Sequence, residues 1–220
     1  MEFMLLAFPA LLSIINPLGG AFIFLGATGN VSHDMRKHLA KWVAIHGFLL
    51  LNVSLYMGAY VLEFFGISMP ILRVAGGIVI TASGWNLLYS DEKPDPAAAV
   101  QLAGDRPPSQ MAFYPLTMPL TTGPGTISVA ISLGTNHRKQ GLEGLLKFVL
   151  AASLTTATIC LLIYVMYRSS DRIAGAIGPT GTTILLRLSA FLLFCIGIQV
   201  FWNGLHELLG TLLVDAKPPA

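Results

Sequence analysis

The sequence predicts an all-α polytopic membrane protein with six transmembrane helices. Apolar residues make up 54% of the 220 residues, charged residues only 11%, and the charged residues cluster in short segments. An ordinary soluble domain carries about 25% charged residues, so this chain lacks the side chains that a soluble globule needs on its surface. The mean hydropathy of +0.70 agrees with that reading. A disordered chain is excluded by the apolar content, and a nucleic-acid binder by the net charge of only +2.

Uncharged runs mark the expected spans in chain order. A helix needs about 20 apolar residues to cross the hydrocarbon core of a bilayer. Four runs have that length, and two longer runs have 31 residues each, too many for one simple span and too few for a helical hairpin. The six runs are residues 3–33, 42–62, 74–90, 107–137, 148–167 and 188–206.

Both long runs contain an interruption near the middle. The first run holds Asn16-Pro17-Leu18-Gly19-Gly20, and the fourth holds Thr121-Thr122-Gly123-Pro124-Gly125-Thr126. Proline removes a backbone donor and glycine permits sharp backbone geometry, so each cluster predicts a broken helix. Freed backbone groups are costly in lipid, and the breaks must therefore face protein or a wet cavity.

An internal repeat predicts two units, residues 1–106 with a linker and residues 107–220. Each half has three spans, an odd number, so the two halves must enter the membrane in opposite senses. Inverted repeats of this kind are common in secondary transporters. The repeat rests on three pairs of short motifs in the same order, namely Phe8-Pro9 with Tyr114-Pro115, Leu72-Arg73-Val74 with Leu186-Arg187-Leu188, and Trp85-Asn86 with Trp202-Asn203.

The two breaks are the predicted substrate site. Half-helix ends carry partial charges of opposite sign, which suit the carboxylate and ammonium of a small zwitterion. Neutral hydroxyl and amide side chains add hydrogen bonds, and glycine lets a ligand approach the backbone. The predicted substrate-binding residues are Asn16, Pro17, Gly19, Gly20, Thr121, Thr122, Gly123, Pro124, Gly125 and Thr126.

Three further residues are candidates for gating or coupling. His46 lies within the second span and titrates near neutral pH if unperturbed, so it is a candidate proton carrier, although a hydrogen-bonded core histidine is the competing interpretation. Arg73 and Arg187 stand at the start of spans three and six, where they act either as membrane-edge anchors or as gates. No motif of a nucleophile, metal set or carboxylate pair is present, so we expect no enzyme, no cofactor and no metal.

Basic residues predict the orientation. Seven lie in the loops after spans one, three and five, and four lie on the opposite side. The positive-inside rule then places both termini outside the cytoplasm. The seven are Arg36, Lys37, Lys41, Lys93, Arg106, Arg168 and Arg172, and the four are Arg138, Lys139, Lys147 and Lys217.

Several motifs together resemble the MarC family of six-span bacterial and archaeal inner-membrane proteins. They are Asn16-Pro17-Leu18-Gly19, Arg73-Val74-Ala75-Gly76-Gly77, and Phe113-Tyr114-Pro115-Leu116-Thr117-Met118-Pro119-Leu120 running into Gly123-Pro124-Gly125. The resemblance covers nearly the whole chain. Ala190 departs from the family pattern, since relatives often have glycine there. The family is grouped with LysE-type exporters, and some members resemble transporters of small neutral amino acids.

The expected function is therefore a secondary transporter or exporter of small neutral amino acids such as glycine or alanine, coupled to protons. A passive small-solute channel and a non-transporting membrane component are the alternatives, because both share the same sequence features. The expected partners are the small-molecule substrate, the lipid bilayer and further copies of the chain in a homo-oligomer, with no nucleic acid.

Overall fold

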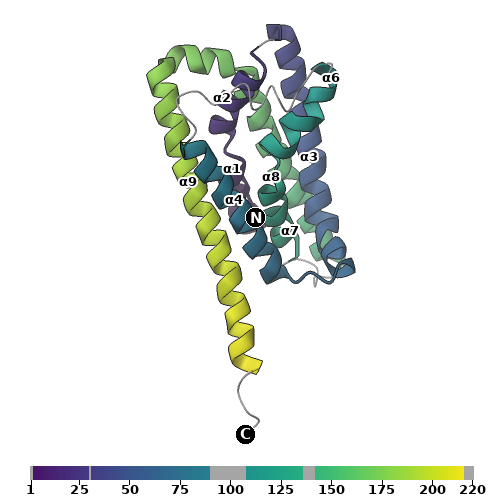
Figure 1. Cartoon of the computed structure of the whole chain (residues 1–220). Coiled ribbons are helices and arrows are strands. Elements are labelled where there is room, and N and C mark those ends of the chain that lie inside the picture. Colours follow the sequence, from purple (N-terminus) through teal and green to yellow (C-terminus); the bar gives the residue numbers. More distant parts are fainter. Residues whose placement is uncertain (1, 30, 90–107, 136–141, 216–220) are drawn as a thin grey trace.

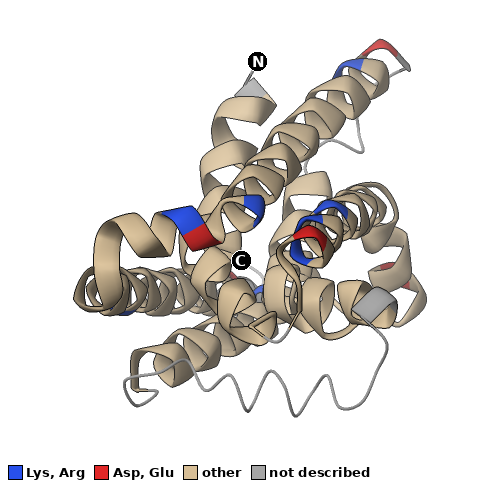
Figure 2. Ribbon diagram, turned by 90° about the horizontal axis from the view of Figure 1, so that it is seen from above, with Lys and Arg blue, Asp and Glu red and all other residues tan. Residues whose placement is uncertain are grey.

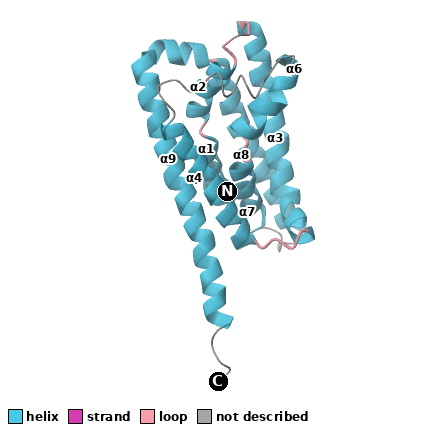
Figure 3. Cartoon of the chain, in the orientation of Figure 1, coloured by secondary structure: helices cyan, strands magenta, loops and turns pink. Residues whose placement is uncertain are grey.

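The computed structural model of the chain describes residues 2–29, 31–89, 108–135 and 142–215, which form helices joined by short loops (Figures 1 and 3). No strand occurs in these ranges. The linker is predicted over residues 90–110, of which residues 90–107 lie outside these ranges, as does the predicted boundary at residues 106 and 107. Residues 108–110 of the predicted linker are helical. The helices are α1 (Glu2–Ile15), α2 (Pro17–Ala27), α3 (His33–Phe64), α4 (Met69–Tyr89), α6 (Pro108–Met111), the π-helix η1 (Ala112–Thr121), α7 (Pro124–Thr135), α8 (Leu142–Arg168) and α9 (Ser170–Asp215).

Within the described ranges, five helical segments are long and apolar enough to cross a membrane. They are Phe3–Ala27, His33–Phe64, Met69–Tyr89, Glu143–Arg168 and Ser170–Gly210. The predicted span over residues 107–137 is divided among α6, η1 and α7, each of which has fewer than 18 residues. Five of the six predicted spans are thus confirmed by length and composition, and the crossing by η1 and α7 stays a prediction.

The outer surface of the helical bundle carries few polar side chains, as expected for contact with lipid. Large apolar side chains such as Leu5, Phe64 and Leu150 are exposed, while Leu11, Leu39 and Ile159 are fully buried in the core. Figure 2 shows how few Lys, Arg, Asp and Glu residues the helices carry. A soluble protein rarely exposes so much continuous apolar surface, and a bilayer covers it without cost.

Glycines allow α4 and α9 to pack along each other. A methyl group added to Gly77 would collide with the backbone of Phe201, and one added to Gly84 would lie 2.5 Å from the backbone nitrogen of Phe194. Such small residues let backbones approach closely in membranes. Ala190 is fully buried at the same interface, where its carbonyl oxygen would lie 3.0 Å from a methyl on Gly84.

Helix α9 contains a kink that the sequence analysis did not predict. Gly178 has φ 75° and ψ 171°, and Pro179 follows it. A positive φ favours glycine, and proline starts a new helical segment readily. The first part of α9 therefore lies across one end of the bundle, and the second part turns and runs down its side (Figure 1). Arg187 lies two turns beyond the kink.

Candidate functional site

The first break lies at Asn16, between α1 and α2. Asn16 has φ 47° and ψ 65°, the left-handed conformation that asparagine tolerates better than most residues. Its Oδ1 accepts a hydrogen bond of 3.2 Å from the Gly19 backbone nitrogen, and Pro17 occupies the first turn of α2. A methyl group on Gly19 would lie 2.5 Å from Asn16 Nδ2. Asn16 thus ends one helix and caps the next, which confirms the predicted interruption.

The second break is longer than predicted. The π-helix η1 contains Pro115 and Pro119, and the residues before them, Tyr114 and Met118, have extended φ and ψ angles. Prolines lack the N–H that an α-helix needs, which explains why regular α-helix is absent here. Hydroxyl groups take over part of the bonding, since Thr121 Oγ1 donates to Leu116 O at 2.7 Å. Helix α7 begins only at Pro124.

Tyr167 of α8 connects the two breaks. Its side chain is fully buried, and its hydroxyl lies 2.9 Å from Thr121 Oγ1. Because the Thr121 hydroxyl already donates to a backbone carbonyl, Tyr167 is the donor in this bond. A methyl group on Gly20 would lie 2.6 Å from the same tyrosine oxygen. Phe24 stacks on the Tyr167 ring at 4.6 Å between centroids. The two broken segments therefore meet at one buried hydroxyl.

A second set of buried polar groups lies along α3, which Thr122 of the second break approaches at Gly47. Thr122 Oγ1 makes no hydrogen bond within the described part of the chain, and a methyl group on Gly47 of α3 would lie 3.4 Å from it. Further along α3, Asn52 Nδ2 donates to Thr156 Oγ1 at 3.0 Å, whereas Asn52 Oδ1 has no partner among the described residues. Buried polar atoms are nearly always hydrogen-bonded, so these exceptions favour a polar ligand or water nearby.

Each break lines its own cavity. Asn16 and Pro17 line a cavity of about 350 Å³ with Met166 of α8 and Ser189 of α9. The second cavity, of about 330 Å³, lies against α4 and α9 and is lined by Thr121, Gly123, Pro124, Gly125 and Thr126 among others. Both volumes are at the small end of the range for ligand sites.

The predicted site residues are therefore close but do not share one cavity. Seven of the ten are buried, Asn16 and Gly123 are half-buried, and Pro124 is exposed. Gly19, Gly20 and Thr122 line neither of the two cavities. Tyr167 was missed by the sequence analysis, because a tyrosine inside an apolar run gives no sign of its distant partners.

The gating candidates have different surroundings. His46 is half-buried between the rings of Trp42 and Phe113, each 5.5 Å away between centroids, and its Nδ1 has no hydrogen-bond partner in the described chain. Arg73 donates to Ser132 Oγ at 3.0 Å and forms an ion pair with Glu207. Arg187 is exposed and makes no such contact with any described residue.

An ion-pair cluster at the opposite end of the bundle was also missed. Arg36 is buried, and its Nη1 lies 2.6 Å from both carboxylate oxygens of Asp171. Its Nε and Nη2 donate to the Thr28 hydroxyl and carbonyl at 3.0 and 2.8 Å. His33 Nδ1 lies 3.1 Å from the same carboxylate. The cluster joins the end of α2, the start of α3 and the start of α9.

No metal site is evident in the ranges that the structure describes, where no three His, Cys, Asp or Glu side chains gather suitably. Long apolar helices around interrupted, hydroxyl-lined segments define the class as a polytopic helical membrane protein.

The chain belongs to the MarC family of integral membrane proteins, whose family model matches residues 1–209. It is 33% identical over 205 residues to the inner membrane protein MarC of Escherichia coli strain K12, covering 91% of this chain and 93% of the relative. The MarC protein of Shigella flexneri matches to the same extent. No solved structure matches the chain. Family and fold together make it an integral inner membrane protein.

Proposed function

We propose that the chain is a secondary transporter of small neutral amino acids such as glycine and alanine, coupled to protons. The observation that carries the proposal is the meeting of two broken helices at the buried bond between Tyr167 and Thr121. Irregular backbone at membrane depth is tolerated where it is buried in protein or lines a cavity, and transporters place their substrates at such points.

The chemistry of the breaks supports a small zwitterionic substrate. The helices α2 and α7 both begin at a break, and helix amino-terminal ends attract a carboxylate. The helix α1 ends at the first break, and its carbonyl end attracts an ammonium group. Among the described residues, no Asp or Glu lines either cavity. Cavities of about 350 and 330 Å³ favour a solute of a few heavy atoms.

The packing of the helices supports an inverted repeat. Helix α3 packs on α8 and α4 packs on α9, so corresponding spans of the two halves are partners. The two broken segments make corresponding contacts with the other half: α1 and α2 contact α8, and η1 and α7 contact α3. In addition, α2 contacts α9 and α7 contacts α4. Each of these contacts therefore has a counterpart when the helices of one half are replaced by the corresponding helices of the other. Transporters built from inverted repeats, in which one half rocks against the other, have this symmetry.

Two ion pairs at opposite ends of the bundle are suited to be gates. Arg36 with Asp171 joins α3 to α9 near the start of both helices, and Arg73 with Glu207 joins α4 to the far part of α9. In alternating access, one end opens while the other closes. In this proposal each pair breaks when its end opens, and His46, which has an unpartnered Nδ1, carries the coupling proton.

Counterflow in proteoliposomes tests the proposal. Vesicles loaded with unlabelled glycine should accumulate labelled glycine transiently, and the uptake should saturate and be accelerated by substrate on the opposite side. Asn16→Ala and Gly125→Leu should reduce that uptake at least tenfold. Uptake that neither saturates nor responds to substrate inside would indicate a passive channel. The absence of uptake for glycine, alanine and serine alike would contradict a transporter of this class.

A further inference from the structure

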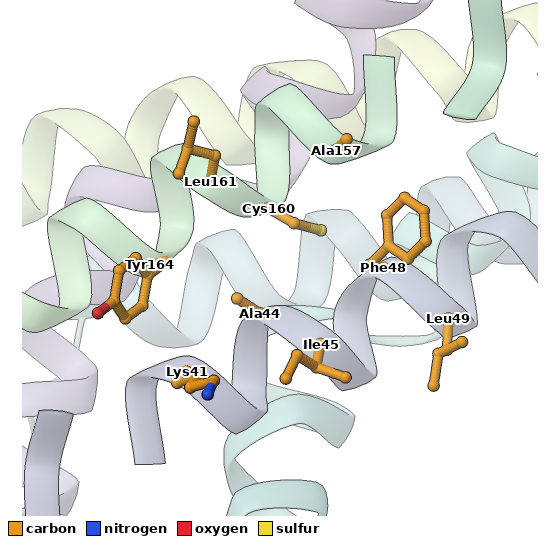
Figure 4. Close-up of a pocket in the computed structure, with 9 residues that line it drawn as sticks. All are labelled: Lys41, Ala44, Ile45, Phe48, Leu49, Ala157, Cys160, Leu161 and Tyr164. Carbon is orange, nitrogen blue, oxygen red and sulfur yellow. The ribbon is translucent and has the colours of Figure 1, made fainter. Parts of the chain in front are cut away.

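We propose that the groove between α3 and α8 binds one anionic phospholipid, with an acyl chain in the groove and the phosphate held by Lys41 and Arg168. The groove has a volume of about 510 Å³ and is separate from the cavities beside the two breaks. Figure 4 shows its lining side chains, which come from one face of each helix.

The wall of the groove fits a hydrocarbon chain. Phe48 and Leu49 of α3 line the groove together with Ala157 and Leu161 of α8. Leu49 and Leu161 expose 55% and 62% of their surface, so the groove opens to the side of the bundle, where lipid lies. Apolar surface of this kind is covered by acyl chains in a membrane.

Positive charge is concentrated at one end of the groove. Lys41 lines it there, together with Tyr164. Arg168 Nη1 donates to the Tyr164 hydroxyl at 2.9 Å, and its guanidinium carbon lies 5.7 Å from the centre of that ring. Since α3 and α8 run in opposite directions, an early residue of α3 and the last residue of α8 meet at the same end.

Both cations lack an acidic partner. Within the described ranges, no carboxylate lies within ion-pair distance of Lys41 or Arg168. The nearby acidic residue Asp171 is already held by Arg36 and His33. Two unpaired cations beside an apolar groove complement a phosphate attached to an acyl chain, and basic pockets between membrane helices recognise anionic head groups in this way.

The level of the cations in the membrane agrees with a head-group site. Trp42 adjoins Lys41, is 41% exposed, and donates through Nε1 to His38 Nε2 at 2.9 Å. Tryptophan and tyrosine gather at the level of the head groups, and Trp42 and Tyr164 flank the two cations. The basic residues of this end are those that the positive-inside rule assigns to the cytoplasm, the side with the more anionic leaflet.

Native mass spectrometry of the detergent-purified full chain tests this site. The chain is titrated with phosphatidylglycerol and with phosphatidylcholine of the same acyl chains. We expect a single tight phosphatidylglycerol adduct, with affinity at least tenfold above that for phosphatidylcholine, because each basic residue contributes about fivefold. Lys41→Gln with Arg168→Gln should abolish the preference. Lys147→Gln, at the other end of the bundle, is the control and should leave it intact.

A second pair of variants tests the groove without changing charge. Ala157→Trp fills the groove and should weaken the binding of both lipids at least tenfold. Leu154→Trp, at another exposed position of α8, should leave the binding of both lipids unchanged. Melting curves of the variants verify that they are folded. Equal affinity for the two lipids, or unchanged phosphatidylglycerol binding in the double variant and in Ala157→Trp, would overturn the proposal.

Discussion

Tyr167 occupies the space that a side chain at position 20 would need. A methyl group on Gly20 would lie 2.6 Å from its hydroxyl oxygen, closer than atoms pack. The tyrosine is fully buried and stacked on Phe24, so it has little freedom to move aside. At the residue scale, the hydroxyl of Tyr167 can lie against the first break and bond to Thr121 of the second because Gly20 has no side chain.

Gly20→Ala should destabilise the protein by about 1–3 kcal/mol, because overpacking of a filled core has this cost. In a Tyr167→Phe background the same change should cost clearly less, since the clashing oxygen is gone. Gly26→Ala in the same helix is the control, with nothing within 4 Å of the added methyl. Thermal melting in detergent compares the unaltered protein with Gly20→Ala, Tyr167→Phe, the double variant and Gly26→Ala. If Gly20→Ala lowered the melting temperature equally in both backgrounds, the contact between position 20 and the Tyr167 hydroxyl would be contradicted.

The backbone at Asn16 gives a second prediction. Asn16→Ala loses the bond to Gly19 and must also adopt a positive φ, which costs an alanine about 1–2 kcal/mol. Asn16→Gly loses only the bond, so it should be the more stable of the two variants. Denaturant titration of both proteins checks the order. An Asn16→Ala variant as stable as Asn16→Gly would show that the left-handed turn is not required.

Local chemistry explains which site residues the sequence could predict. Asn16 and Pro17 stop and restart a helix through their own backbone preferences, so the break is visible in the sequence. The role of Tyr167 depends on Thr121, 46 positions away, and on Gly20 in another helix. The sequence predicts Arg36 only as a basic loop residue, whereas in the structure it is buried with Asp171 as its partner. Distant partners of this kind leave no short-range pattern.

At the scale of helices, Arg36 holds three elements together. Its guanidinium bonds to Thr28 after α2 and to Asp171 at the start of α9, while the residue itself belongs to α3. Without Arg36, the partly exposed Asp171 carboxylate would keep only His33 and solvent as partners, and the Thr28 carbonyl would lose a buried hydrogen bond. The cluster should therefore be a main determinant of how this end of the bundle is held.

Arg36→Ala should destabilise the protein by about 1.5–3 kcal/mol, because it removes charge-assisted hydrogen bonds to a carboxylate that is partly exposed. Arg36→Lys should recover only part of this loss, because lysine cannot reproduce the planar fork. Arg172→Ala, with an exposed side chain on α9, is the matched control and should change stability by less than about 0.5 kcal/mol. Chemical unfolding in detergent gives the values. Similar decreases in the free energy of unfolding for Arg36→Ala and Arg172→Ala would contradict the role of Arg36 in holding the three helices together.

The elements themselves were predicted in unequal detail. Uncharged runs revealed the spans because charge is costly in lipid. The π-helix η1 and the kink at Gly178 were missed, since proline and glycine predict an irregularity without specifying its form. The Tyr114 and Met118 backbones precede prolines and are extended for that reason.

At the scale of the whole molecule, the number of crossings decides whether the two halves are inverted. Five segments of the described chain are long enough to span, and an inverted repeat of three plus three spans requires η1 with α7 to supply a sixth crossing. In a chain whose two natural cysteines are replaced by serine, single cysteines at positions 98 and 140 should then be labelled from opposite sides of the membrane. The label is an impermeant maleimide applied to oriented vesicles. Labelling of both positions from one side would contradict six spans and the inverted repeat.

The proposed transport requires the two broken helices to act as one unit through Thr121 and Tyr167. Labelled glycine counterflow in proteoliposomes tests this requirement in a matched pair of variants. Thr121→Val removes the acceptor of the Tyr167 hydroxyl, whereas Thr158→Val makes the same change where the hydroxyl bonds only to Leu154 of its own helix. We predict at least tenfold slower counterflow for Thr121→Val and an unchanged rate for Thr158→Val. Equal rates in the two variants and the unaltered protein would contradict this requirement.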